Sequence, residues 1–119
     1  MQTYNDLIVW QRSIQLVKAI YKLTNLFPKS EIFGLSSQMR RAAISIPANI
    51  AEGYARKHRA EYLQFLRIAF GSGAELETFI VLTEELNFAN NSDTSDVRKY
   101  LDETMRMLNK LISSLVAKP

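Results

Sequence analysis

The stretch that decides the fold is QMRRAAISIPANIAEG, residues 38–53. Around it, apolar residues recur every three or four positions, which indicates the buried face of a helix. That face consists of Leu35, Met39, Ala43, Ile46, Ile50 and Tyr54. The pattern begins after Pro28-Lys29-Ser30 and ends near Arg56, with Pro47 in its interior. Because a proline removes a backbone donor and crowds the carbonyl four residues earlier, we expect a kink near Pro47.

A polar stripe runs along the same predicted helix. It consists, at spacings of three or four residues, of Gln38, Arg41, Ser45, Asn49, Glu52 and Arg56. Such side chains are costly in an interior unless they hydrogen-bond to one another or to a neighbouring helix. We interpret the first five, together with Ser72, as a structural polar network that fixes the register of the helices. The alternative is that the stripe lines a seam or channel between subunits.

A first helix precedes this one, from about Asp6, which we expect to cap it, to Phe27, where Pro28 ends it. Its buried face is expected to consist of Leu7, Trp10, Ile14, Val17, Tyr21 and Thr24, widened by Val9, Leu16, Ile20, Leu23 and Phe27. This apolar arc is broad enough for two neighbouring helices, and also for contact with another chain.

Two more helices follow, one from about Arg59 to Phe88 and one after a loop and helix-start signal at Asn90–Ser95. Gly71 and Gly73 lie inside the third helix, where a glycine costs about 1 kcal/mol relative to alanine. We expect them to allow close approach of the small residues of the second helix. Four helices of about 30–45 Å with short connections predict an all-α fold, an antiparallel up-down four-helix bundle in one domain, residues 1–119.

Composition limits the class of protein. The chain of 119 residues is 47% hydrophobic and 23% charged, which is ordinary for one globular domain. It contains no cysteine, which excludes disulfides, thiolate metal sites and cysteine nucleophiles. The longest apolar runs have only a few residues, and the N-terminus lacks the basic and apolar regions of a signal peptide. We therefore expect a soluble cytoplasmic protein that does not associate with membranes.

The sequence offers little for catalysis. His58 is the single histidine, and Ala55 stands three residues before it, so the Glu-x-x-His pairs of a di-iron bundle are missing. No glycine-rich loop follows a strand pattern, and no second histidine could complete a catalytic relay. We therefore expect a protein that is not an enzyme and has no catalytic residue, metal or cofactor.

A basic cluster falls where the second helix gives way to the third. The predicted nucleic-acid-binding residues are Arg56, Lys57, His58 and Arg59, together with Arg40 and Arg41 and with Arg67 nearby. Contacts between such side chains and phosphates dominate affinity for RNA and DNA. Tyr54 and Tyr62 flank the cluster and could stack on bases. The other interpretation is a solvated turn whose tyrosines belong to the core.

An acidic stretch supports a second hypothesis. Between Gly71 and Asp96 the chain has six carboxylates and no basic residue, although its formal net charge is +3. A surface of this kind could dock a basic protein partner through the residues from Glu75 to Asp96. Nucleic-acid binding is our leading hypothesis, and a protein-interaction scaffold is its alternative.

The run from Leu35 to Gly53 also carries a specific resemblance. With Val9-Trp10-Gln11, Phe27-Pro28-Lys29 and Glu75-Leu76-Glu77, it resembles the four-helix-bundle proteins encoded in intervening sequences of bacterial 23S ribosomal RNA genes, over nearly the whole chain. The accessory variability proteins of diversity-generating retroelements look like relatives, and those bind nucleic acid and a reverse transcriptase. The resemblance implies a ring-like homopentamer without catalytic residues and with no settled activity.

Overall fold

Four long helices make up most of the computed structural model, which describes residues 3–117. They are α1 (Ile8–Thr24), α2 (Leu35–Arg56), α3 (Arg59–Glu85) and α4 (Asn91–Val116), with short 3₁₀ turns η1 (Tyr4–Asp6) and η2 (Lys29–Glu31). The described residues contain no strand. The prediction of an all-α fold with four helices is therefore confirmed.

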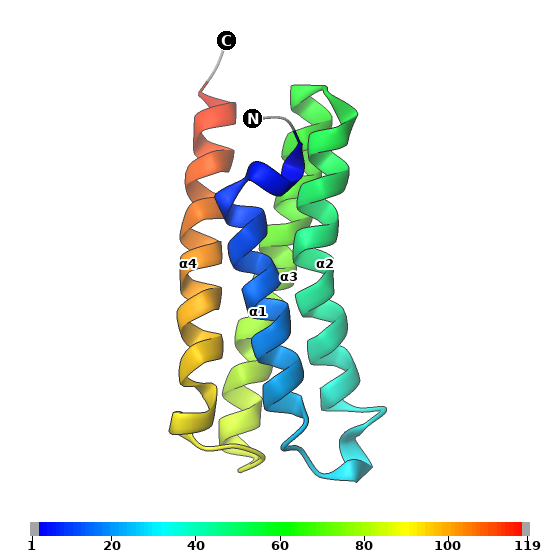
Figure 1. Cartoon of the computed structure of the whole chain (residues 1–119), viewed down its shortest axis with the longest axis vertical. Coiled ribbons are helices and arrows are strands. Elements are labelled where there is room, and N and C mark those ends of the chain that lie inside the picture. Colours follow the sequence, from blue (N-terminus) through cyan, green and yellow to red (C-terminus); the bar gives the residue numbers. More distant parts are fainter. Residues whose placement is uncertain (1–2, 118–119) are drawn as a thin grey trace.

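The helices pack as a bundle with principal extents of 48 × 22 × 21 Å. α1 and α3 each pack against both α2 and α4. Figure 1 shows successive helices running in opposite directions, so that the α2–α3 turn lies at the same end as the start of α1 and the end of α4. The α1–α2 and α3–α4 connections lie together at the opposite end. The two ends of the bundle therefore present different segments to solvent.

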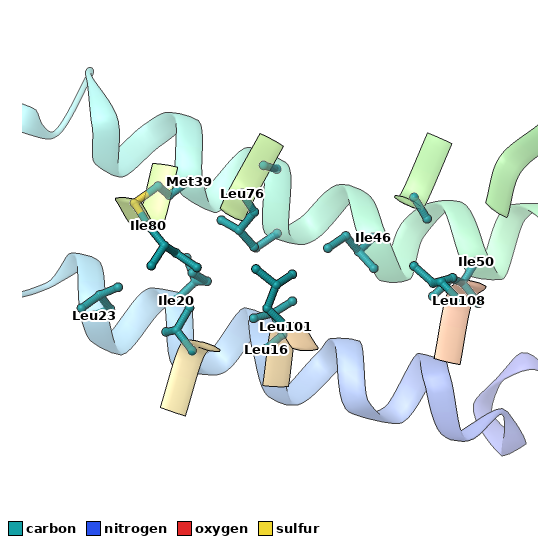
Figure 2. Close-up of a cluster of buried hydrophobic side chains, with 14 of the residues drawn as sticks. Leu16, Ile20, Leu23, Met39, Ile46, Ile50, Leu76, Ile80, Leu101 and Leu108 are labelled. Carbon is teal, nitrogen blue, oxygen red and sulfur yellow. The ribbon is translucent and has the colours of Figure 1, made fainter. Parts of the chain in front are cut away.

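All four helices contribute apolar side chains to one core, part of which Figure 2 shows. Its fully buried members include Leu16, Ile20, Met39, Ile46, Ile50, Leu66, Leu76, Ile80 and Leu108. The face of α1 differs from the expected one, because Tyr21 is exposed and Ser13 is completely buried. The Ser13 hydroxyl is satisfied by donating to the Trp10 carbonyl at 2.7 Å. The arc of α1 is apolar on so many sides that periodicity alone could not fix its rotation.

Several helix boundaries differ from those expected. α1 ends at Thr24 rather than near Phe27, and α2 begins only at Leu35. Asp6 belongs to a capping box with Thr3 that begins η1, and Leu7 is the residue before α1. Asn90 caps α4 by accepting from the Asp93 amide at 2.9 Å, so α4 begins at Asn91, at the start of the expected loop and helix-start signal. α3 ends at Glu85, three residues earlier than expected. Local capping chemistry, rather than the apolar pattern, sets these limits.

The close approach between α2 and α3 uses Gly53, one of the small residues expected on α2, and neither Gly71 nor Gly73 of α3. A Cβ on Gly71 would meet nothing within 4 Å, and one on Gly73 would meet the Met105 side chain of α4. The expectation that both glycines admit α2 is therefore wrong. Instead, a Cβ on Gly53 of α2 would lie 2.7 Å from the Phe65 Cβ of α3. α2 is continuous across the buried Pro47, and the kink there stays a prediction.

Candidate nucleic-acid interface

The four basic residues Arg56–Arg59 form the basic turn between α2 and α3, at one end of the bundle (Figure 1). Arg56 is the last residue of α2, and Lys57 takes a left-handed conformation with a φ of 63°. His58 is extended and precedes the first residue of α3, Arg59. All four residues are exposed. The chain thus reverses within two residues and places these four exposed side chains together at one end of the bundle.

A hollow of about 370 Å³ opens beside the basic turn. It is lined by Gly53, Tyr54, Lys57, His58, Arg59 and Tyr62. The two tyrosine rings meet edge to face with centroids 5.9 Å apart. Burial, and secondarily the neighbouring Tyr54, raises the pKa of Tyr62 above its usual value, so its phenol stays neutral at physiological pH. Cationic groups beside aromatic rings are suited to a ligand that combines a phosphate with a planar ring.

The cations of the basic turn are not equally available. Arg56 lies 3.4 Å from the Glu52 carboxylate and 3.8 Å from that of Glu61, and its guanidinium stacks 5.2 Å from the centre of the Phe65 ring. The side chains of Lys57 and His58 make no hydrogen bond or ion pair with the rest of residues 3–117, although the His58 carbonyl accepts from the Tyr62 amide at 2.9 Å. The charge of Lys57 is therefore available to a ligand, whereas the charge of Arg56 is already paired with two carboxylates.

The structure separates Arg40 and Arg41 from the basic turn. Arg56 lies fifteen positions beyond Arg41 in the continuous helix, a distance of about 22 Å. Arg40 donates to the Thr24 hydroxyl at 2.8 Å and to the Asn25 side-chain oxygen at 3.0 Å, and its guanidinium lies 4.5 Å from the centre of the Tyr21 ring. Arg40 thus ties the start of α2 to the end of α1, a contact that no local sequence signal announces.

The polar stripe of α2 lies on the outer side of the α2–α3 contact and not in the core. The Ser45 and Ser72 hydroxyls hydrogen-bond across the two helices at 2.8 Å. Asn49 donates to the Ser45 hydroxyl at 2.9 Å and to the Ser45 carbonyl at 2.7 Å. Gln38 and Arg41 are exposed and take no part, and Glu52 pairs with Arg56. The six expected members therefore reduce to a cluster of three half-buried side chains.

A hydrogen-bonded cluster that the sequence analysis missed joins α3 to α4. Glu84 accepts from the Thr94 hydroxyl at 2.7 Å and forms a two-pronged ion pair with Arg98, whose Nε lies 3.1 Å from the carboxylate. The hydrogen bond from Arg98, followed by that from Thr94, lowers the pKa of Glu84 below its usual value. The same pairing raises the pKa of Arg98. The charge of one of the six acidic residues is thereby paired with a cation, while the other five carboxylates stay exposed.

Acid should remove the stabilisation that this cluster provides. Since the folded-state pKa of Glu84 is lowered, its contribution is complete above the unfolded value near 4.5 and is lost as pH falls through the folded value. We expect Glu84→Gln to destabilise the protein at pH 7 and to have a smaller effect at pH 3, measured by urea unfolding. Glu85→Gln, at the exposed neighbouring position, is the control and should have little effect at either pH. An equal effect of Glu84→Gln at both pH values would contradict this account.

Residues 3–117 offer neither a metal site nor a membrane-spanning helix. No group of three or more histidine, aspartate and glutamate side chains there could hold a metal ion. No helix in this part of the chain is long and apolar enough to cross a membrane.

Most of the chain matches a known protein family. The model of a protein family described as 23S rRNA-intervening sequence protein matches residues 5–110, which is most of the chain. No curated protein matches. The resemblance carried by the α2 sequence is therefore confirmed for this family, while the likeness to accessory variability proteins stays a prediction.

Proposed function

Because the chain belongs to the family of 23S rRNA-intervening sequence proteins, which supplies a helical fold but no activity, we propose a function from the surface itself. The chain is a non-enzymatic, oligomeric bundle that binds nucleic acid through the basic turn. Its ligand is RNA rather than DNA. In the oligomer, taken as a homopentamer from the family resemblance, each copy contributes one basic turn. Several weak sites then act together and raise the avidity without new contacts.

The observation that carries the proposal is the hollow beside the basic turn. The Lys57 side chain has no ion pair within residues 3–117. Lys57 and Arg59 line the hollow together with Tyr54 and Tyr62. In this mechanism the cations contact phosphates, which supplies salt-dependent affinity. The half-buried tyrosines offer a ring on which an unpaired base can stack. Arg56 acts chiefly by holding the turn, since Glu52 and Glu61 already share its charge.

One observation favours the scaffold as a second candidate. Apart from Glu84, the carboxylates between Glu75 and Asp96 stay exposed. Glu85, Asp93 and Asp96 belong to the end of the bundle opposite the basic turn (Figure 1). A basic protein partner could therefore dock without competing for the turn.

The test is binding of RNA and DNA to the purified oligomer across a salt series, beside Arg56→Ala/Lys57→Ala/Arg59→Ala. We expect the triple variant to lose at least about tenfold in affinity and to show a shallower salt dependence, because each lost phosphate contact removes about 0.7–0.9 from the logarithmic slope. The matched control, Lys18→Ala/Lys99→Ala/Lys110→Ala, removes three exposed charges elsewhere and should keep most of the affinity. The oligomer size is measured for every variant.

Two results would change the assignment. Equal binding by the triple variant and the wild type would place the site elsewhere, with Lys18 and Lys22 as the next residues to test. No binding at low salt by any variant would reject nucleic-acid binding and leave the scaffold as the function to pursue.

A further inference from the structure

The most exposed large apolar side chain in the described residues belongs to Phe33, which is 94% exposed. It follows Ile32, which is 58% exposed, in the segment between η2 and α2, and we call these two residues the apolar knob. The backbone around the apolar knob is held in place. Gly34 donates to the Glu31 carbonyl at 3.0 Å, and the Glu31 carboxylate accepts from the Leu35 amide at 3.1 Å. The knob is thus presented to solvent by an ordered turn, which is typical of an interaction site.

A complementary hollow of about 330 Å³ lies between α1 and α4, and we call it the α1–α4 hollow. It is lined by Ala19, Lys22, Leu23, Leu26, Ser92, Asp93, Asp96 and Val97. Leu26 in its wall is 57% exposed, so the hollow has an apolar surface without a cover in the described residues. A volume of this size is at the lower end for binding pockets and has room for a single aromatic side chain.

The apolar knob and the α1–α4 hollow occupy opposite sides of the same end of the bundle. In Figure 1 the connection that carries the knob projects beyond α2, whereas the start of α4 lies on the far side of α1. A chain therefore cannot place its own knob in its own hollow. Two copies standing side by side in the same orientation bring the knob of one copy to the hollow of the next.

The charges around the two surfaces also match. Lys29 lies four residues before Phe33, and Asp96 lines the α1–α4 hollow. Both are exposed, and neither side chain has an ion pair within residues 3–117. Lys22, also exposed, lies on the rim of the hollow, while Glu31 accompanies the knob. Opposite charges at the two surfaces favour the side-by-side arrangement and set its orientation.

We infer that Phe33 of one copy docks into the α1–α4 hollow of a second copy, with Lys29 beside Asp96 of that copy. This inference rests on the oligomeric part of the proposed function and is independent of nucleic-acid binding. The contact is heterologous, since it joins two different surfaces of the same chain. Repeated around an axis along the bundle, it closes into a ring with all basic turns on one side.

The test uses two variants that each remove one half of the contact. Phe33→Asp removes the knob at an exposed position, and Ala19→Arg fills the hollow from its α1 wall. We expect each variant alone to weaken self-association at least tenfold, measured by sedimentation, with the helical circular dichroism retained. An equimolar mixture keeps one intact knob and one intact hollow, and it should form a pair containing one copy of each variant.

A charge exchange provides a second test that does not depend on filling the hollow. Lys29→Glu should weaken self-association, and Lys29→Glu with Asp96→Lys in the same chain should restore it. Ile8→Asp, at a 58% exposed apolar position on the opposite end, is the matched control for Phe33→Asp and should leave assembly intact.

Three results would overturn the inference: wild-type assembly by Phe33→Asp, no pairing in the mixture of folded variants, or no recovery in the charge exchange. A wild-type chain that stays monomeric would also reject the oligomeric part of the proposed function. An assembled wild type that is indifferent to Phe33→Asp would reject only this contact.

Discussion

We expect Leu76→Ala to lower the free energy of unfolding by about 2–5 kcal/mol, the range for removing a fully buried leucine from a packed core. Leu76 is 0% exposed and lies among side chains from the facing helices, with Leu16 and Ile46 nearby in Figure 2. The substitution removes apolar contacts and leaves a cavity that helices joined by short turns can close only in part. Urea unfolding at a fixed protein concentration measures the change, because assembly shifts the apparent stability.

Leu82→Ala is the matched control for this core prediction. Leu82 lies on the same helix, α3, but its side chain is 40% exposed. We expect a cost of about 1 kcal/mol or less, since much of the side chain is already in water. Similar losses for Leu76→Ala and Leu82→Ala would show that the two faces of α3 are assigned wrongly.

Gly53→Ala should destabilise the protein by about 1–3 kcal/mol, although alanine is the better helix former. A Cβ at this position would lie 2.7 Å from the Phe65 Cβ and 3.3 Å from the Tyr62 carbonyl. Neither atom is the free end of a flexible side chain, so α2 and α3 would have to move apart. Because Gly53 and Tyr62 also line the hollow at the basic turn, the same change should weaken nucleic-acid binding.

Gly71→Ala tests the same substitution where nothing opposes it. Gly71 is exposed inside α3, and a Cβ there would meet nothing within 4 Å. The gain in helix propensity should therefore appear undiminished, as a stabilisation of about 1 kcal/mol in chemical unfolding. If both glycine variants shifted the stability in the same direction, the close approach at Gly53 would not be the reason that α2 carries a glycine.

The periodicity of apolar residues located the four helices because burial on one face of a helix repeats with a local period. The same reasoning misplaced the buried face of α1. Tyr21 was expected inside and is exposed, whereas Ser13, a polar residue, is completely buried. A helix that is apolar over a wide arc can rotate without violating its pattern, so only packing against α2 and α4 selects the rotation.

The candidate site was accessible to sequence reasoning only in part. The run of four basic and potentially basic residues, Arg56–Arg59, predicted the basic turn. The separation of Arg40 and Arg41 from this turn follows only from the continuity of α2. The hollow beside the turn depends on the left-handed conformation of Lys57, which brings the start of α3 back over Tyr54. Such a conformation is uncommon for lysine, and no local pattern predicts it.

The sequence by itself determined the helical class, the number of helices and the family, because these depend on composition, local periodicity and the motif in α2. Only the tertiary structure decided which side chains meet. Arg40 bonds to Thr24 across sixteen residues and Glu84 to Arg98 across fourteen, whereas no side chain among residues 3–117 covers Phe33. These contacts depend on the rotation of each helix about its axis and on the residues at which each helix begins and ends. Packing of the whole chain sets both.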